Sequence, residues 1–130
     1  MTDAAVFALI TKSTEMPDGS LLVRGTATDP SLDADAQRCD PAWLKSAMPD
    51  WFRYGNIREQ HSNIAAGVAT HYEVEEGDRH VIEAKIVDPG SVAKVKAGVL
   101  KGFSIGIRNP QIRADKSAPG GIIQNGQIVE

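Results

Sequence analysis

The chain has 130 residues with 14 basic and 17 acidic side chains, a net charge of −3, and a single cysteine, Cys39. This length predicts one domain with a sizeable core, and it is too short for an α/β-hydrolase. The mild acidity gives no electrostatic footprint for nucleic acid or an anionic membrane, and one cysteine excludes a disulfide framework or a thiolate metal cluster.

The N-terminal third predicts two strands and a loop. The apolar run Ala4–Ile10 follows an aspartate rather than a basic stretch, so we expect no signal peptide. Strands are predicted over Val6–Lys12 and Ser20–Thr28, joined by the turn Pro17-Asp18-Gly19. The polar segment Asp29–Arg38 predicts an irregular, mobile loop.

A helix is predicted to begin at Asp40-Pro41, because aspartate caps helices and proline is tolerated in their first turn. Pro49 should end or kink this helix. Apolar residues recur through and beyond it at a spacing typical of a core-facing side, so we expect them in the core: Trp43, Leu44, Ala47, Met48, Trp51, Phe52 and Tyr54.

The segment Ile64–Val87 alternates in the manner of strands, and Glu75–Asp78 predicts a hairpin turn within it. Asp88-Pro89 predicts the start of a second helix, for which Gly102 is a well-placed end. No apolar run approaches the length of a membrane span.

The last quarter predicts two more strands. Phe103, Ile105 and Ile107 alternate with polar or small residues, and Gly120-Gly121 predicts a turn before a final strand over Ile122–Glu130. The resulting order, roughly ββ-α-βββ-α-ββ, lacks the regular alternation of parallel α/β folds. We therefore predict an α+β fold with a mostly antiparallel, β-barrel-like sheet and two or more short packed helices.

The motif Gly102-Phe103-Ser104-Ile105-Gly106 contains the pattern Gly-x-Ser-x-Gly. In α/β-hydrolases that serine follows a strand and precedes a helix, and the histidine comes later in the chain. Here the predicted order of elements is reversed, and every histidine precedes the serine. The motif is therefore either accidental or part of a serine hydrolase with the order His…Ser.

A serine nucleophile needs a base within hydrogen-bond reach, and His61, His71 and His80 are the candidates. We expect His71 on an exposed strand face and His80 in packing or turn structure, whereas His61 lies in a polar run typical of catalytic loops. No two histidines have zinc-ligand spacing. Cys39 is a weak candidate nucleophile, because the adjacent Asp40 should raise its pKa.

These features together resemble the phage prohead (capsid maturation) protease family, whose fold is similar to that of herpesvirus assembly proteases. The resemblance is carried by an N-terminal strand that runs into Gly25–Asp29, by a histidine after a helix and an aromatic segment, by Gly67-Val68-Ala69, and above all by Val95–Gly106. It implies Ser104 as nucleophile, His61 as base and Glu130 as the third triad member. It also suggests Arg108-Asn109-Pro110 as an oxyanion-hole loop.

The resemblance implies a serine endopeptidase that cleaves scaffold or major capsid protein inside the immature prohead, in the bacterial host cytoplasm. It implies no cofactor or metal and neither a nucleic-acid nor a membrane partner, with self-cleavage and a homodimer as options. The alternative is a capsid- or scaffold-associated β-barrel interaction module that has lost turnover. We expect one protease domain over residues 1–130, truncated at or just after the third catalytic position.

The resemblance also leads to two geometric expectations. His61 should lie within about 3–4 Å of Ser104. Glu130 should be disordered or displaced from His61, because a terminal residue has no downstream strand to hold it.

Overall fold

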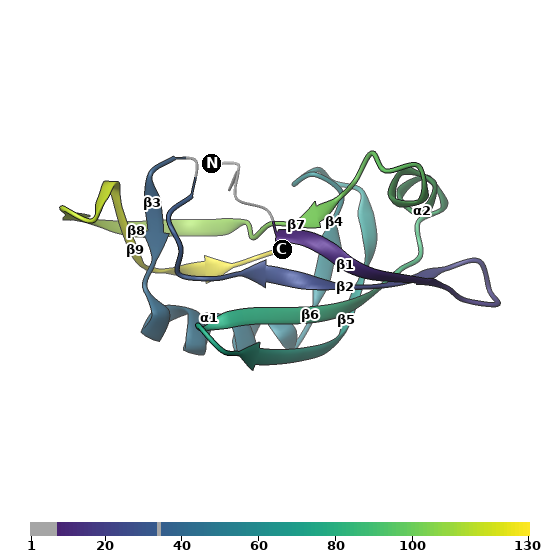
Figure 1. The fold of residues 1–130 in the computed structure, drawn as a ribbon, viewed down its shortest axis with the longest axis horizontal. Helices are drawn as coiled ribbons and strands as arrows, with labels where there is room; N and C mark the ends of the chain where they lie inside the picture. Colours follow the sequence, from purple (N-terminus) through teal and green to yellow (C-terminus); the bar gives the residue numbers. More distant parts are fainter. Residues whose placement is uncertain (1–7, 34) are drawn as a thin grey trace.

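The computed structural model describes residues 8–33 and 35–130 (Figure 1). Residues 4–7, which belong to the first apolar run and in part to the predicted first strand, lie outside the described residues. The described elements are β1 (Ala8–Glu15), β2 (Leu21–Thr28), β3 (Gln37–Cys39), α1 (Pro41–Phe52), β4 (Asn56–Arg58), β5 (Ala65–Glu75), β6 (Arg79–Ile86), α2 (Pro89–Lys96), β7 (Gly102–Phe103), β8 (Ile107–Asp115) and β9 (Ala118–Ile128).

The strands form two sheets. The larger has the order β4-β5-β6-β2-β1-β7 and is antiparallel throughout, and the smaller has the order β3-β9-β8 with β3 parallel to β9. The predicted α+β class, the mostly antiparallel sheet and the two helices are confirmed for the described residues. The sheets do not close into a barrel, because the larger sheet ends at β4 and β7, which do not pair.

The core lies among the larger sheet, α1 and strand β9 of the smaller sheet. Alternate residues of β2 and β6 are buried, as the two-residue period of a strand requires. Most of the apolar stripe of α1 packs with them as predicted, but Tyr54 does not, since it is 77% exposed beyond the end of the helix. The fully or nearly buried side chains of this core include Leu21, Val23, Leu44, Met48, Trp51, Ile82, Ala84 and Ile86.

Helix α1 begins as predicted and continues further than predicted. The Asp40 carboxylate accepts the backbone N–H of Trp43 at 3.0 Å, and a proline occupies the first turn. Pro49 does not end the helix, which continues to Phe52. Buried Met48 and Trp51 flank the proline on both sides, so core packing holds the last turn despite the lost hydrogen bond.

Helix α2 begins at the predicted cap but ends earlier than predicted. Asp88 accepts the backbone N–H of Ser91 at 2.9 Å. The helix ends at Lys96, and Gly98, with φ +76°, takes the left-handed conformation that we assigned to Gly102. Figure 1 shows α2 at the opposite end of the molecule from the tip of the β8–β9 hairpin. None of the helices in the described ranges is long and apolar enough to cross a membrane.

The last hairpin turns at Lys116-Ser117, so the predicted turn at Gly120-Gly121 is wrong. The Asp115 carboxylate accepts the backbone N–H of Ser117 at 2.8 Å, which is a side-chain route to a tight turn. Gly121 instead lets β9 approach β8, because a Cβ there would lie 2.4 Å from the Ile112 side chain.

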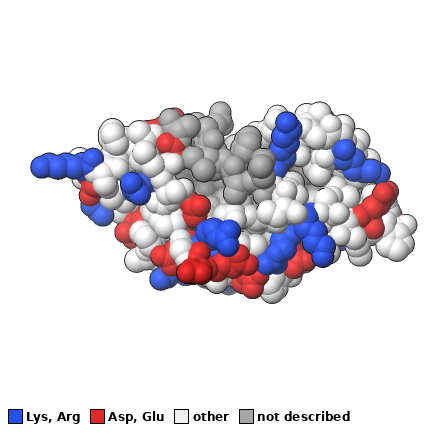
Figure 2. Space-filling model, viewed as in Figure 1, with Lys and Arg blue, Asp and Glu red and all other residues white. Residues whose placement is uncertain are grey.

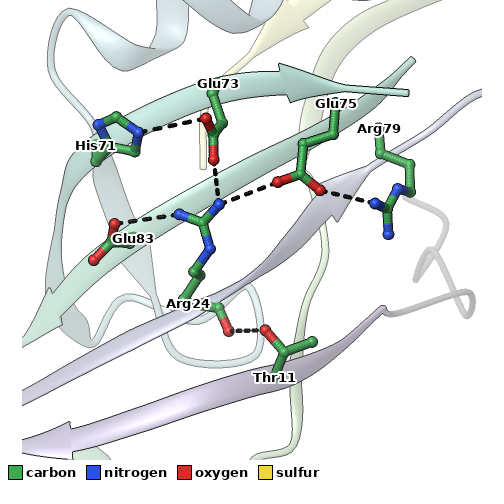
Figure 3. Close-up of polar contacts among 7 residues, drawn as sticks. All are labelled: Thr11, Arg24, His71, Glu73, Glu75, Arg79 and Glu83. Atoms are coloured by element: carbon green, nitrogen blue, oxygen red, sulfur yellow. Dashed lines mark hydrogen bonds and ion pairs between the residues drawn. The ribbon is translucent and has the colours of Figure 1, made fainter. Parts of the chain in front are cut away.

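The outer face of the larger sheet is polar. Arg24 on β2 pairs with Glu83 on β6 at 3.2 Å and with Glu73 and Glu75 on β5, linking three neighbouring strands (Figure 3). Arg79 extends the network to Glu75. Such exposed pairs contribute little stability individually. Figure 2 shows basic and acidic side chains interspersed on one face of the molecule.

Candidate active site

His61 projects from a tight loop between β4 and β5. The loop is closed by two backbone hydrogen bonds, from Glu59 N–H to Ile64 O at 3.1 Å and from Ser62 N–H to Glu59 O at 2.9 Å. Gln60 and His61 both have left-handed backbones, with φ of +49° and +57°. Non-glycine residues rarely adopt this conformation, which tends to cluster at functional sites.

Ser104 lies between β7 and β8, in a short segment over 104–106 that belongs to neither strand, where the sequence predicted a continuous strand. Its neighbours Phe103 and Ile105 are buried, so the intervening serine side chain points away from their side of the chain, as the alternation predicted. Helix α2 precedes this segment and strand β8 follows it. Ser104 is therefore not at a strand-to-helix elbow, which agrees with the predicted order of elements.

Glu130 is held at the site, contrary to our expectation that it would be disordered or displaced. Its carbonyl accepts the Gly106 N–H at 3.1 Å, and the Val129 N–H donates to the Gly106 carbonyl at 2.9 Å. Asn56 in β4 donates its side-chain amide to the Val129 carbonyl. The expectation failed because these neighbours supply the pairing that a downstream strand would otherwise give.

Gly106 also makes room for the Glu130 side chain. A Cβ at this position would lie 2.5 Å from Glu130 Cγ and 2.8 Å from Cδ, which is too close for any real contact. The glycine of the Ser-Ile-Gly motif thus permits a carboxylate to pack directly beside the serine segment. The Glu130 side chain is only 8% exposed.

The three predicted side chains lie in one hydrogen-bonded row. His61 Nε2 is 2.6 Å from Ser104 Oγ, and His61 Nδ1 is 2.8 Å from Glu130 Oε2. The first distance confirms the expected proximity of His61 and Ser104. In the neutral tautomer with its proton on Nδ1, the imidazole donates to the carboxylate and accepts from the hydroxyl. Arg58 Nη1 lies 3.5 Å from the other carboxylate oxygen of Glu130.

The other two histidines lie where the sequence predicted. His71 is exposed on β5, 3.9 Å from Glu73. His80 is fully buried, with Nδ1 2.7 Å from the Tyr72 hydroxyl, and burial lowers its pKa. Neither histidine has a hydrogen bond to Ser104 in the described part of the chain.

Two other predicted groups do not join the site. Burial first, and Asp33 second, raise the pKa of Cys39 to about 12, whereas we had attributed a raised pKa to Asp40. Such a thiol is a poor nucleophile. Arg108-Asn109-Pro110, the suggested oxyanion-hole loop, lies in β8, and none of the three residues lines the cavity next to Ser104. Residues 8–33 and 35–130 contain no group of three or more side chains suited to a metal ion.

A cavity of about 610 Å³ adjoins the row. Ser104, His61 and Glu130 line it, together with an apolar wall that includes Ile57, Val95, Leu100, Phe103 and Ile105. A partly open, apolar cavity beside a few convergent polar groups is the usual form of a small-molecule or side-chain binding site.

Sequence reasoning missed three residues of the site: Asn56, Arg58 and Glu59. Asn56 and Arg58 bind the C-terminal residues, and Glu59 is buried beneath the histidine loop. Arg58 and Glu59 belong to the polar segment that contains His61. Nothing in the sequence indicates that Glu130 contacts this segment in the folded chain.

No protein-family model matches the sequence, and no curated protein matches it either. A comparison with solved structures found the bacteriophage T4 capsid assembly protease, gp21, with a TM-score of 0.69 and 13% sequence identity. The match covers 94% of this chain and 88% of that one. At this identity the likeness concerns the fold alone. The chain therefore has a phage prohead protease-like fold, as the motif around Ser104 and the preceding histidine predicted.

Proposed function

We propose that the protein is a serine endopeptidase in which Ser104 is the nucleophile, His61 the general base and Glu130 the orienting acid. The observation that supports this best is the continuous row of two short hydrogen bonds, 2.6 Å from Ser104 to His61 and 2.8 Å from His61 to Glu130. A nucleophile, a base and a third group that orients the base form the constellation that serine hydrolases need.

In the proposed reaction Ser104 Oγ attacks the scissile carbonyl carbon while His61 Nε2 takes the hydroxyl proton. The tetrahedral intermediate collapses as His61 returns that proton to the leaving amine, which leaves an ester on Ser104. Water then repeats the attack with His61 as base, and release of the carboxylic acid restores the hydroxyl.

Glu130 would stabilise the imidazolium that forms in each step. Its side chain is nearly excluded from water, and its second oxygen faces Arg58. A fixed carboxylate in such surroundings interacts with a developing positive charge more strongly than a solvated one would.

The substrate that we propose is a capsid or scaffold polypeptide of an assembling phage shell, met inside the prohead in the host cytoplasm. This rests on the fold shared with the T4 protein, which is described as a capsid assembly protease. The apolar cavity beside Ser104 supports a peptide substrate, because it could accept an apolar side chain near the scissile bond.

The test is cleavage of purified capsid and scaffold proteins by the wild-type chain and by Ser104→Ala. We expect new termini with wild type and a rate at least about 1,000-fold lower with the variant. The variant should keep its fold, because the hydroxyl faces the cavity rather than the core. Ser117→Ala, in the exposed β8–β9 turn, is the matched control. Equal cleavage by Ser104→Ala would refute the assignment, and no cleavage by any form would favour a non-enzymatic module.

A further inference from the structure

Glu59 carries a buried carboxylate beneath the histidine loop. Its side chain is 5% exposed, and its Oε1 lies 2.7 Å from Nζ of the half-exposed Lys94 in α2. Among the described residues Oε1 has no hydrogen bond of good geometry, so this ion pair is the contact that offsets the burial of the carboxylate. Glu59 and His61 belong to the same loop, which the Glu59 N–H and carbonyl both help to close.

Lys94 connects in the other direction to the serine. Its backbone carbonyl accepts the N–H groups of Val99 at 2.8 Å and of Leu100 at 3.2 Å. Those residues begin the segment that runs through β7 to Ser104. One residue of α2 therefore binds the loop of the base through its side chain and the segment of the nucleophile through its backbone.

The base loop has a particular need for such support. Two consecutive left-handed residues, Gln60 and His61, are maintained only if the surroundings hold them. Helix α2 itself buries little, with Ser91 and Val92 as its buried residues. The Glu59–Lys94 ion pair connects the His61 loop to helix α2. Glu59, Val95 and Leu100 also line the cavity beside Ser104.

We propose that the Glu59–Lys94 pair is a positioning device that fixes His61 relative to Ser104. Neither residue touches the reacting atoms, and both act through the segments that carry the base and the nucleophile. The proposal rests on the proposed function for its kinetic consequences, but its effect on the His61 imidazole is measurable without any substrate.

The variants are Glu59→Gln, Lys94→Met, the double variant and Lys94→Arg. Lys96→Met is the matched control, because Lys96 is on the same helix and pairs at 3.1 Å with the half-exposed Glu15, away from the site. The readouts are the rate of Ser104 modification by a fluorophosphonate, the ¹⁵N shifts of the His61 ring, and the free energy of unfolding.

We expect each single charge removal to slow modification by about 10- to 100-fold, since an error of about 1 Å in reacting geometry has effects of this size. The His61 ring shifts should move toward the tautomer mixture of a free imidazole. Lys94→Arg should retain much of the rate, and Lys96→Met should match wild type.

The double variant separates positioning from simple stabilisation. Removing both charges leaves no unpaired buried carboxylate, so its stability should recover relative to the less stable single variant. We expect slow modification and altered His61 shifts to persist in this variant. The proposal would be overturned if the modification rate and the His61 shifts of the double variant recovered along with its stability. It would also be overturned if Lys96→Met had the same effect as Lys94→Met.

The outcomes for the positioning role and for the proposed function are distinguishable. If the wild-type chain is not modified at all, the proposed function fails. If the His61 shifts are unchanged in Glu59→Gln and Lys94→Met, the positioning role alone is overturned.

Discussion

The backbone at His61 decides where its side chain can reach. With φ of +57°, after Gln60 at +49°, the loop turns sharply enough to direct the imidazole at both Ser104 and Glu130. A residue in this region is unfavourable unless its surroundings compensate, and the loop's two backbone hydrogen bonds contribute part of that compensation. The direction of the His61 imidazole thus depends on an unfavourable backbone conformation at that residue.

Gly106 gives a direct test of how tightly the Glu130 side chain is seated. Gly106→Ala would place a Cβ 2.5 Å from Glu130 Cγ, so the carboxylate must shift away from His61. We expect turnover to fall by about 10- to 100-fold with little change in KM, because only the orientation of the base is disturbed.

The control for this substitution is Gly90→Ala. At that position the nearest atom to a new Cβ is Oδ2 of the capping residue Asp88 at 3.4 Å, which is an ordinary contact at the start of α2. Equal activity of Gly106→Ala and wild type would show that the seat of Glu130 does not limit the rate.

Glu130→Gln tests the orienting charge without changing the shape of the side chain. The amide can still contact His61 Nδ1, but it can offer its NH₂ group instead of an acceptor, which favours the wrong tautomer. We expect kcat to fall by about 100- to 10,000-fold while substrate binding changes little. Steady-state kinetics on a cleaved peptide would measure this, and an unchanged kcat would mean that another group orients His61.

At the scale of elements, the sequence predicted the helix caps, which depend on neighbouring residues. It did not predict the roles of glycines, which depend on contacts with distant strands. Asp40 and Asp88 each cap a helix as predicted, because capping depends on neighbours within one turn. Gly102 and Gly120 were assigned to a helix end and a turn, yet both lie in strands. Glycine permits a turn and a close approach of strands equally, and only the folded chain distinguishes these uses.

The cap of α1 offers a prediction at this scale. Asp40→Ala removes the acceptor of the Trp43 N–H at the start of the helix. We expect the free energy of unfolding to fall by about 1 kcal/mol, measured by urea denaturation. Asp50→Ala, which removes an exposed pair with Arg53 on the same helix, should change it by less than about 0.5 kcal/mol. Equal effects of the two variants would contradict the capping role.

For the whole molecule, the sequence predicted the fold class and the proximity of Ser104 and His61, but it did not predict the position of the Glu130 side chain. Ser104 and His61 lie in motifs with their own local signals. The position of Glu130 depends on contacts with Gly106 and Asn56, which are far from it in the chain. Pairing across such separations leaves no local pattern, which is why a disordered Glu130 was expected.

His80 makes the stability of the whole fold depend on pH. It is fully buried, and burial lowers its pKa below the usual 6.5, with smaller influences from Asp78 and Lys45. Below about pH 6.5 the unfolded chain therefore binds more protons than the folded one. The free energy of unfolding should fall as the pH decreases from about 6.5 toward the lower folded pKa.

Denaturation curves at a series of pH values would measure this slope, which for one proton reaches at most about 1.4 kcal/mol per pH unit. His80→Gln should flatten the slope in that window. A slope unaffected by His80→Gln would assign the pH dependence to other groups.

The central claim is that His61 activates Ser104 for attack. Its most direct measurement is reaction of the native chain with a fluorophosphonate probe, read by intact mass and peptide mapping. The account predicts a single adduct on Ser104, absent in Ser104→Ala and formed at least about 100-fold more slowly in His61→Gln. A folded wild-type chain that forms no adduct, or forms it on another serine, would contradict the account.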